Sequence, residues 1–172
     1  MAQGFRGEVG QWVVVSDGGN RVLAQMASSP DRVFNVALAR ETRARDLSLS
    51  VRLRPVEGKE DQGGGLVWRA RDAKNYYIAR FNPLEDNFRV YKVVAGKRTQ
   101  LGTVDVNRPE GWHTLTVRMV GDHIVCVLDG AARLDVRDAT FPDAGMIGLW
   151  TKADARTWFD DLELAAADPS TL

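Results

Sequence analysis

A polar turn between two predicted strands carries side chains suited to binding a ligand. Residues 82–87 read NPLEDN, and the proline, asparagine and aspartate side chains are typical of a tight turn. The flanking strands add Arg80 before the turn and Arg89 and Tyr91 after it. Side chains two residues apart share one face of a strand. We therefore expect a polar patch with an aromatic wall if the two strand faces coincide.

Planar polar groups beside an aromatic ring suit the binding of sugars. Hydroxyl groups need hydrogen-bond partners, and the apolar face of a sugar stacks on a ring. The alternative is a solvated hairpin in which Arg80 pairs with the acids of its own turn, and both interpretations stay open. The predicted ligand-binding residues of the hairpin are Arg80, Asn82, Glu85, Asp86, Asn87 and Tyr91.

Two tryptophans and a lysine are candidate walls for the same surface. Trp150 and Lys152 share a strand face in the stretch GLWTKAD. Trp68 alternates with Leu66 and Ala70, which is the pattern of a buried face. Aromatic residues of a sandwich lie mostly in its core, so packing is the competing interpretation for both tryptophans.

Adjacent acidic residues near the C-terminus are of the type used in hydrolysis and in metal binding. A glycosidase needs two facing carboxyl groups, about 5–9.5 Å apart. Asp160 and Asp161 are neighbours in a predicted strand, so their side chains should point to opposite faces. Asp160 is a candidate ligand for structural calcium, because calcium takes carboxylate oxygens. The alternative is an aspartate bonded to the backbone, and no cofactor other than calcium is expected.

Composition limits the classes of function. The 172 residues include 23 Lys and Arg and 23 Asp and Glu, and this balance gives no electrostatic basis for binding nucleic acid. His113 and His123 are too few for a multi-histidine metal site, and Cys126, alone in an apolar run, reads as a core residue. No apolar run approaches the roughly 20 residues of a membrane span. The first residues lack a signal-peptide core, so we expect a cytoplasmic protein or an exported one whose leader has been removed.

Short runs of alternating polarity, separated by Gly, Pro, Asn and Asp, predict an all-β sandwich of two packed sheets. Residues 31–46 fit strand and helix equally, and no other segment suggests a long helix. We expect a single domain over residues 1–172, with its core at 11–164 and terminal extensions at 1–10 and 165–172. The roughly twelve expected strands are 11–16, 21–26, 46–55, 64–70, 76–82, 88–94, 98–104, 112–120, 123–129, 132–136, 145–151 and 156–164.

Three segments together carry a resemblance to a known superfamily. They are GGGLVWRARDAKNYYIARFNPLEDNFRVYKVVAGKR (63–98), GWHTLTVRMVGDHIVCVLDGAARLDVRD (111–138) and GMIGLWTKADARTWFDDLEL (145–164). The chain resembles the concanavalin A-like lectins and glucanases, and within them the laminin-G-like and 3-keto-disaccharide hydrolase-type domains of bacteria. The resemblance implies an antiparallel jelly roll with one convex and one concave sheet. It also implies that ligands bind on the concave sheet or at its rim.

The resemblance implies a carbohydrate-binding, lectin-like domain that uses its concave sheet. One alternative is a hydrolase of glycosidic bonds, with Glu85, Asp86 or Asp154 as acid or base, with or without a divalent metal. The E-x-D-x-x-E strand of the glucanase branch is absent, which argues against that retaining mechanism. The other alternative is a non-catalytic structural or partner-binding domain. Burial of Trp68 and Trp150 together with an ion-paired Arg80 would argue against both the lectin-like and the hydrolase interpretations and leave this last one.

Overall fold

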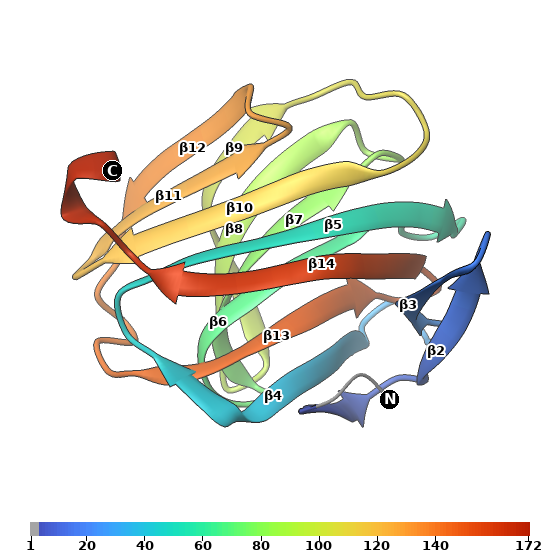
Figure 1. Ribbon diagram of the computed structural model, residues 1–172, viewed down its shortest axis with the longest axis horizontal. Helices are drawn as coiled ribbons and strands as arrows, with labels where there is room; N and C mark the ends of the chain where they lie inside the picture. Colours follow the sequence, from blue (N-terminus) through green and yellow to red (C-terminus); the bar gives the residue numbers. More distant parts are fainter. Residues whose placement is uncertain (1–3) are drawn as a thin grey trace.

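Two seven-stranded antiparallel sheets pack face to face in the computed structural model, which describes residues 4–172 (Figure 1). Sheet A has the order β1-β4-β13-β6-β7-β8-β9, and sheet B has the order β12-β11-β10-β5-β14-β3-β2. In sheet A the strands are β1 (Phe5–Val9), β4 (Phe34–Ala44), β6 (Gly64–Asp72), β7 (Asn75–Asn82), β8 (Asn87–Val94), β9 (Lys97–Asp105) and β13 (Gly145–Lys152). In sheet B they are β2 (Trp12–Asp17), β3 (Asn20–Gln25), β5 (Leu47–Glu57), β10 (His113–Val120), β11 (His123–Leu128), β12 (Ala132–Arg137) and β14 (Arg156–Ala166).

The predicted jelly-roll sandwich is confirmed, with two strands more than the twelve expected. Strand β1 lies in the segment expected to be a terminal extension, and β4 lies where helix and strand fitted equally. In the part of the chain that the structure describes, the sole helix is the short 3₁₀ turn Pro169–Thr171. No helix in residues 4–172 is long and apolar enough to cross a membrane.

The core between the sheets follows the alternation of the strands. Every second residue of β5 is buried, from Leu47 to Leu53, and these side chains face alternate residues of sheet A. Cys126 is fully buried in this cluster, and burial raises the pKa of its thiol. The prediction that Cys126 is a core residue is therefore confirmed.

Sheet A is buried on its outer face as well, because it curls. The Arg98 guanidinium, from β9, lies 5.5 Å from the centre of the Phe34 ring in β4. These strands are five places apart in the sheet, which is roughly 24 Å along a flat sheet at the usual spacing and more than the two side chains can span. The outer face of sheet A is therefore concave. Its apolar cluster consists of Val36, Leu38, Val67, Ala70, Tyr76, Ile78, Tyr91, Val93, Met146 and Trp150.

Three consecutive glycines let the strands of this face approach closely. A Cβ atom on Gly63 would lie 2.1 Å from the Phe81 carbonyl oxygen, and one on Gly65 would lie 1.7 Å from that of Ala79. Backbone therefore fills the space that a side chain would need. Gly65 pairs with Trp150 on one side and Arg80 on the other, which leaves room on the concave face for these two large side chains.

Candidate functional site

Arg80 is the centre of a buried polar network at one end of the concave face. Its side chain is 1% exposed. Its Nη2 donates to Oε2 of Glu85 at 3.1 Å, to Oδ1 of Asn87 at 3.0 Å and to the Tyr91 hydroxyl at 3.0 Å. Strands β7 and β8 pair in register from Tyr76–Val93 to Asn82–Asn87, so the strand faces predicted to coincide do so.

The turn itself divides into residues that join this network and one that does not. Oδ1 of Asn82 accepts hydrogen bonds from the amides of Leu84 and Glu85 at 2.9 and 3.1 Å, which fixes the turn. Asp86 is exposed with φ 51°, and its carbonyl accepts from the Val106 amide at 2.9 Å. Arg80 therefore pairs with Glu85 of its own turn, and Asp86 serves the turn backbone.

Asp61 is the network residue that sequence analysis missed. It is 2% exposed, and its Oδ1 accepts from Nδ2 of Asn82 at 2.7 Å. Nη1 of Arg80 lies 3.7 Å from Oδ1 and Nζ of Lys152 lies 3.4 Å from Oδ2. Burial raises the pKa of Asp61, and the two cations oppose that rise. Asp61 lies in the loop before β6, where no periodicity places a side chain. The one feature of the sequence that could have indicated Asp61 is its position two residues before the glycine run that begins at Gly63.

Glu85 is the ionised, accessible acid of the network. Its side chain is 42% exposed and also lies 3.4 Å from Nη1 of Arg89. Partial burial raises the pKa of Glu85, but the hydrogen bond from Asn87 and the charges of Arg80 and Arg89 outweigh it and lower the pKa overall. Arg89 is 32% exposed. Lys152, 15% exposed, bonds Asp31 at 2.6 Å. Glu85, Arg89 and Lys152 therefore present charge at the rim of the network.

Neither candidate tryptophan is exposed for stacking on a ligand, and that part of the prediction is wrong. Trp68 faces the core between the sheets, where it stacks on Tyr77 at 5.5 Å. Trp150 is on the concave face as predicted, but it is fully buried, with Nε1 donating to the Tyr76 hydroxyl at 3.0 Å. Arg98 lies over its ring at 5.9 Å. A ring without exposed surface offers no stacking platform, because the curl of sheet A has brought other side chains over it.

Asp154, an acid/base candidate, instead holds the loop that contains Asp61. Its carboxylate accepts from the backbone amides of Lys59 at 2.8 Å, Glu60 at 3.1 Å and Asp61 at 3.0 Å. Burial raises the pKa of Asp154, but these three hydrogen bonds outweigh it and lower the pKa. A carboxylate held ionised by three amides is a poor proton donor. The structure therefore assigns Asp154 a positioning role.

Asp154→Ala is expected to loosen this loop and to lower the free energy of unfolding by about 1–2 kcal/mol, since three amides lose a charged acceptor. Urea denaturation measures the loss, and amide hydrogen exchange should accelerate at residues 59–61. Asp135→Ala is the matched control, because its carboxylate is 51% exposed and pairs only with side chains. Unchanged exchange at residues 59–61 would contradict the positioning role.

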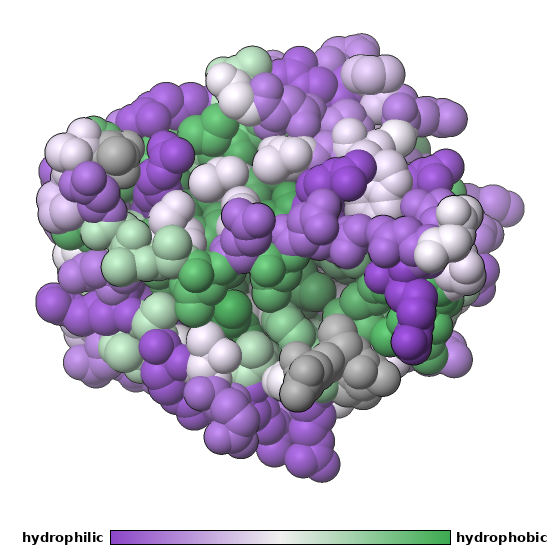
Figure 2. All heavy atoms as spheres, viewed as in Figure 1, coloured by the Kyte–Doolittle hydropathy of each residue, from purple (hydrophilic) through white to green (hydrophobic). Residues whose placement is uncertain are grey.

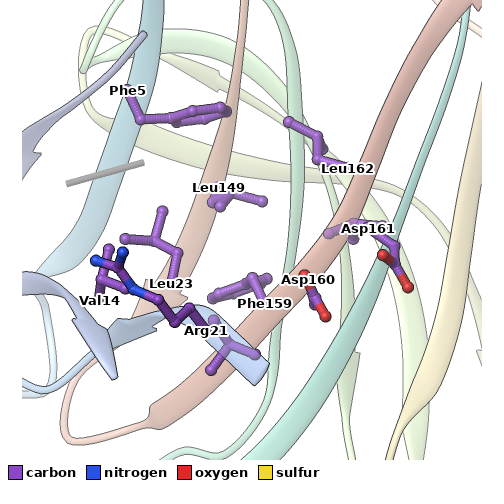
Figure 3. A pocket seen from close by; sticks show the side chains of 11 residues that line it. Phe5, Val14, Arg21, Leu23, Leu149, Phe159, Asp160, Asp161 and Leu162 are labelled. Carbon is purple, nitrogen blue, oxygen red and sulfur yellow. The ribbon is translucent and has the colours of Figure 1, made fainter. Parts of the chain in front are cut away.

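Asp160 and Asp161 lie together beside a cavity of about 370 Å³ between the sheets. The prediction that they point to opposite faces is wrong, because a β-bulge with φ 50° at Asp161 interrupts the strand. Figure 3 shows both at one side of the cavity, with Phe5, Leu149 and Phe159 among the apolar residues around it. In the view of Figure 2, hydrophobic residues gather near the centre of the molecular surface, with hydrophilic residues around them.

The calcium prediction stays untested at Asp160. Its Oδ2 accepts from Nδ2 of Asn20 at 2.7 Å, a side-chain partner where sequence analysis had considered a backbone one. Within residues 4–172, no group of three or more His, Cys, Asp or Glu side chains is placed to hold a metal ion.

Comparison with known proteins identifies the fold. No family model and no curated protein matches the chain. A solved carbohydrate binding module, CBM66 from Bacillus subtilis, matches with a TM-score of 0.83 and 20% identity, over 95% of this chain and 96% of that one. A protein of unknown function with a galectin-like fold, also from B. subtilis, matches with a TM-score of 0.70 and 12% identity, over 94% and 89%.

A GH16 protein of Bacteroides ovatus, solved with a G4G4G3G product, shares the fold with a TM-score of 0.67 and 10% identity, over 96% of each chain. The chain therefore shares the jelly-roll sandwich fold of these solved structures. These structural similarities do not test the more specific resemblance to 3-keto-disaccharide hydrolase-type domains.

Proposed function

We propose that this chain is a carbohydrate-binding domain whose binding surface is the polar end of the concave face. The observation that carries the proposal is the Arg80 network, whose buried side chains hold charged and polar groups in fixed positions at its rim. The similarity to the CBM66 module, which covers nearly the whole of both chains, supports a binding role for the domain as a whole.

The rim groups would recognise sugar hydroxyls by hydrogen bonding. Glu85 is held ionised and accepts, whereas Arg89 and Lys152 donate. Arg80 and Asn87 hold Glu85 in place, so little side-chain entropy is lost when a ligand binds. With Trp68 and Trp150 buried, recognition depends on these polar contacts and on pre-organisation.

A glycosidic hydrolase, including one of the 3-keto-disaccharide type, is less favoured. Asp61 and Glu85 have pKa values shifted in opposite directions, which is the pattern of an acid/base pair. Asp61, however, is buried beneath Arg80 and Asn82 and is bonded to the latter. A general acid must reach the glycosidic oxygen, and Asp61 cannot do so from this position.

A glycan array probed with the full chain, with and without calcium, tests the proposal. Glu85→Gln should weaken any hit at least tenfold, because a charged acceptor is lost at the rim. Arg133→Gln, an exposed residue of β12 on the other sheet, should leave affinity unchanged. Absence of any hit would overturn the proposal, and hits indifferent to Glu85→Gln would remove this network from the site. A calcium requirement that Asp160→Asn abolishes would support the calcium prediction.

A partner-binding domain is the second candidate. The observations in its favour are the burial of both tryptophans, Trp68 in the core between the sheets and Trp150 on the concave face, and the ion pair of Arg80 with Glu85. Co-purification of a defined protein partner, released by Glu85→Gln and accompanied by no glycan hit, would establish this candidate over sugar binding.

A further inference from the structure

Three guanidinium nitrogens on the concave face are buried without an acceptor. Among residues 4–172, Nε and Nη1 of Arg80 and Nη1 of Arg98 have no hydrogen-bond partner. A buried, unpaired donor is costly, and a charged one more so. We infer that the ligand of this surface carries a carboxylate, received by Arg98 and Arg80. This inference rests on the proposed function and names the class of sugar as acidic, with a uronic acid as its simplest form.

The two guanidinium groups lie around one aromatic ring. Cζ of Arg98 is 4.3 Å from the centre of the Tyr91 ring, and Cζ of Arg80 is 5.7 Å from it. Arg98 also lies near the faces of Phe34 and Trp150. In the described chain no carboxylate oxygen comes within 4.0 Å of Arg98, so its contacts are ring faces. Burial lowers the pKa of Arg98, and the charge of Arg80 adds to that effect.

The nearby acids are already engaged by other groups. Oδ1 of Asp61 lies 3.7 Å from Nη1 of Arg80, which is an ion pair but too long for a hydrogen bond. That oxygen accepts from Asn82 instead, and Oδ2 lies by Lys152. Asp31 also pairs with Lys152. Glu85 accepts a hydrogen bond from Nη2 of Arg80 and leaves Nε and Nη1 without an acceptor. An acceptor for the remaining nitrogens must therefore come from outside the network.

A carboxylate is the acceptor that best fits this arrangement. Its two oxygens match the planar fork of a guanidinium, and its charge offsets the repulsion between the two arginines. A neutral hydroxyl group supplies an oxygen without that charge. Arg98 projects from β9, which ends sheet A. Movement of its guanidinium off the Trp150 ring would open the path to Arg80, and the carboxylate would then join the two residues.

Calorimetric titration of the full chain with matched monosaccharides tests the inference. The pairs are D-glucuronate with D-glucose and D-galacturonate with D-galactose, with sodium acetate as the free carboxylate. The uronates are expected to bind at least tenfold more tightly than their neutral partners. Arg98→Gln should abolish that preference, and Arg98→Lys, which keeps the charge, should retain part of it.

Arg54→Gln is the matched control, because Arg54 also lies over a tryptophan, Trp158 at 5.4 Å, but on sheet B. It should leave the preference intact. Neutral sugars that bind as tightly as uronates would overturn the acidic-sugar inference while leaving the proposed function standing. Acetate that binds as tightly as the uronates would show an adventitious anion only and overturn it too. Absence of binding by every sugar here and on the array would overturn both.

Discussion

Arg80→Ala is expected to lower the free energy of unfolding by about 3–5 kcal/mol, the usual cost of removing one partner of a buried ion pair. The side chain is 1% exposed and serves four neighbours: Asp61, Glu85, Asn87 and Tyr91. Its removal leaves Asp61 without the more deeply buried of its two cations, since the Arg80 side chain is 1% exposed and that of Lys152 is 15% exposed. It also empties a volume under the turn that the curled sheet cannot easily fill.

Denaturation at two pH values isolates the ionic part of this effect. Burial raises the pKa of Asp61 in the folded protein, so this residue favours folding when protonated and less so as the pH rises through its folded pKa. Arg80 opposes the rise, and the folded pKa of Asp61 should therefore be higher still in Arg80→Ala. The loss of stability caused by Arg80→Ala should accordingly be greatest at neutral pH and smaller near pH 4, roughly the usual carboxyl pKa.

Two further variants control for trivial causes. Arg156→Ala removes an exposed arginine whose pair with Glu57 is 36% and 64% accessible, and should cost no more than about 1 kcal/mol. Asp61→Asn combined with Arg80→Ala should be less damaging than the sum of the two single changes, because the buried charge is gone. An equal loss at neutral and acidic pH, with additive single effects, would contradict the ionic account.

The local pattern of the sequence predicts which side chains share a strand face but not whether that face is open. Period-two alternation correctly placed Arg80, Asn87 and Tyr91 together. Closure depends on the curl of sheet A, which brings Arg98 of β9 over Phe34 of β4. Such a contact joins residues 64 positions apart in the chain, and no local pattern contains it.

The same limit explains the two missed strands. β4 has a continuous buried stretch from Asn35 to Ala39, since β1 and β13 flank it and both its faces are covered. Continuous burial removes the alternation that identifies a strand. β1, of sequence FRGEV, is short and half polar. Bulges break the pattern too: Ala70 was expected on the Trp68 face, but φ 46° at Arg69 turns it to the concave face.

Trp150→Ala is expected to cost about 3–5 kcal/mol, the usual loss for truncating a buried aromatic residue. The ring is fully buried, packs 5.3 Å from Phe34 and bonds the Tyr76 hydroxyl. A stacking platform for ligands would be half exposed and cheap to remove, so this change separates a packing role from a binding role. Urea denaturation followed by circular dichroism measures the loss independently of tryptophan fluorescence.

The loss of stability in Trp150→Ala is to be compared with that in Trp158→Ala. Trp158 is only partly buried, on β14 of sheet B, with the Arg54 guanidinium 5.4 Å from its ring, and its loss should cost about 1 kcal/mol, as for an exposed cation–π pair. Trp150→Phe should also cost about 1 kcal/mol, the hydrogen bond to Tyr76. If Trp150→Ala were no more costly than Trp158→Ala, the concave face would be open in solution and Trp150 would be free to stack on a sugar. A large difference instead means that Trp150 is a packing residue of the curled sheet A, so that the proposed ligand binding would have to depend on the charged groups at the rim.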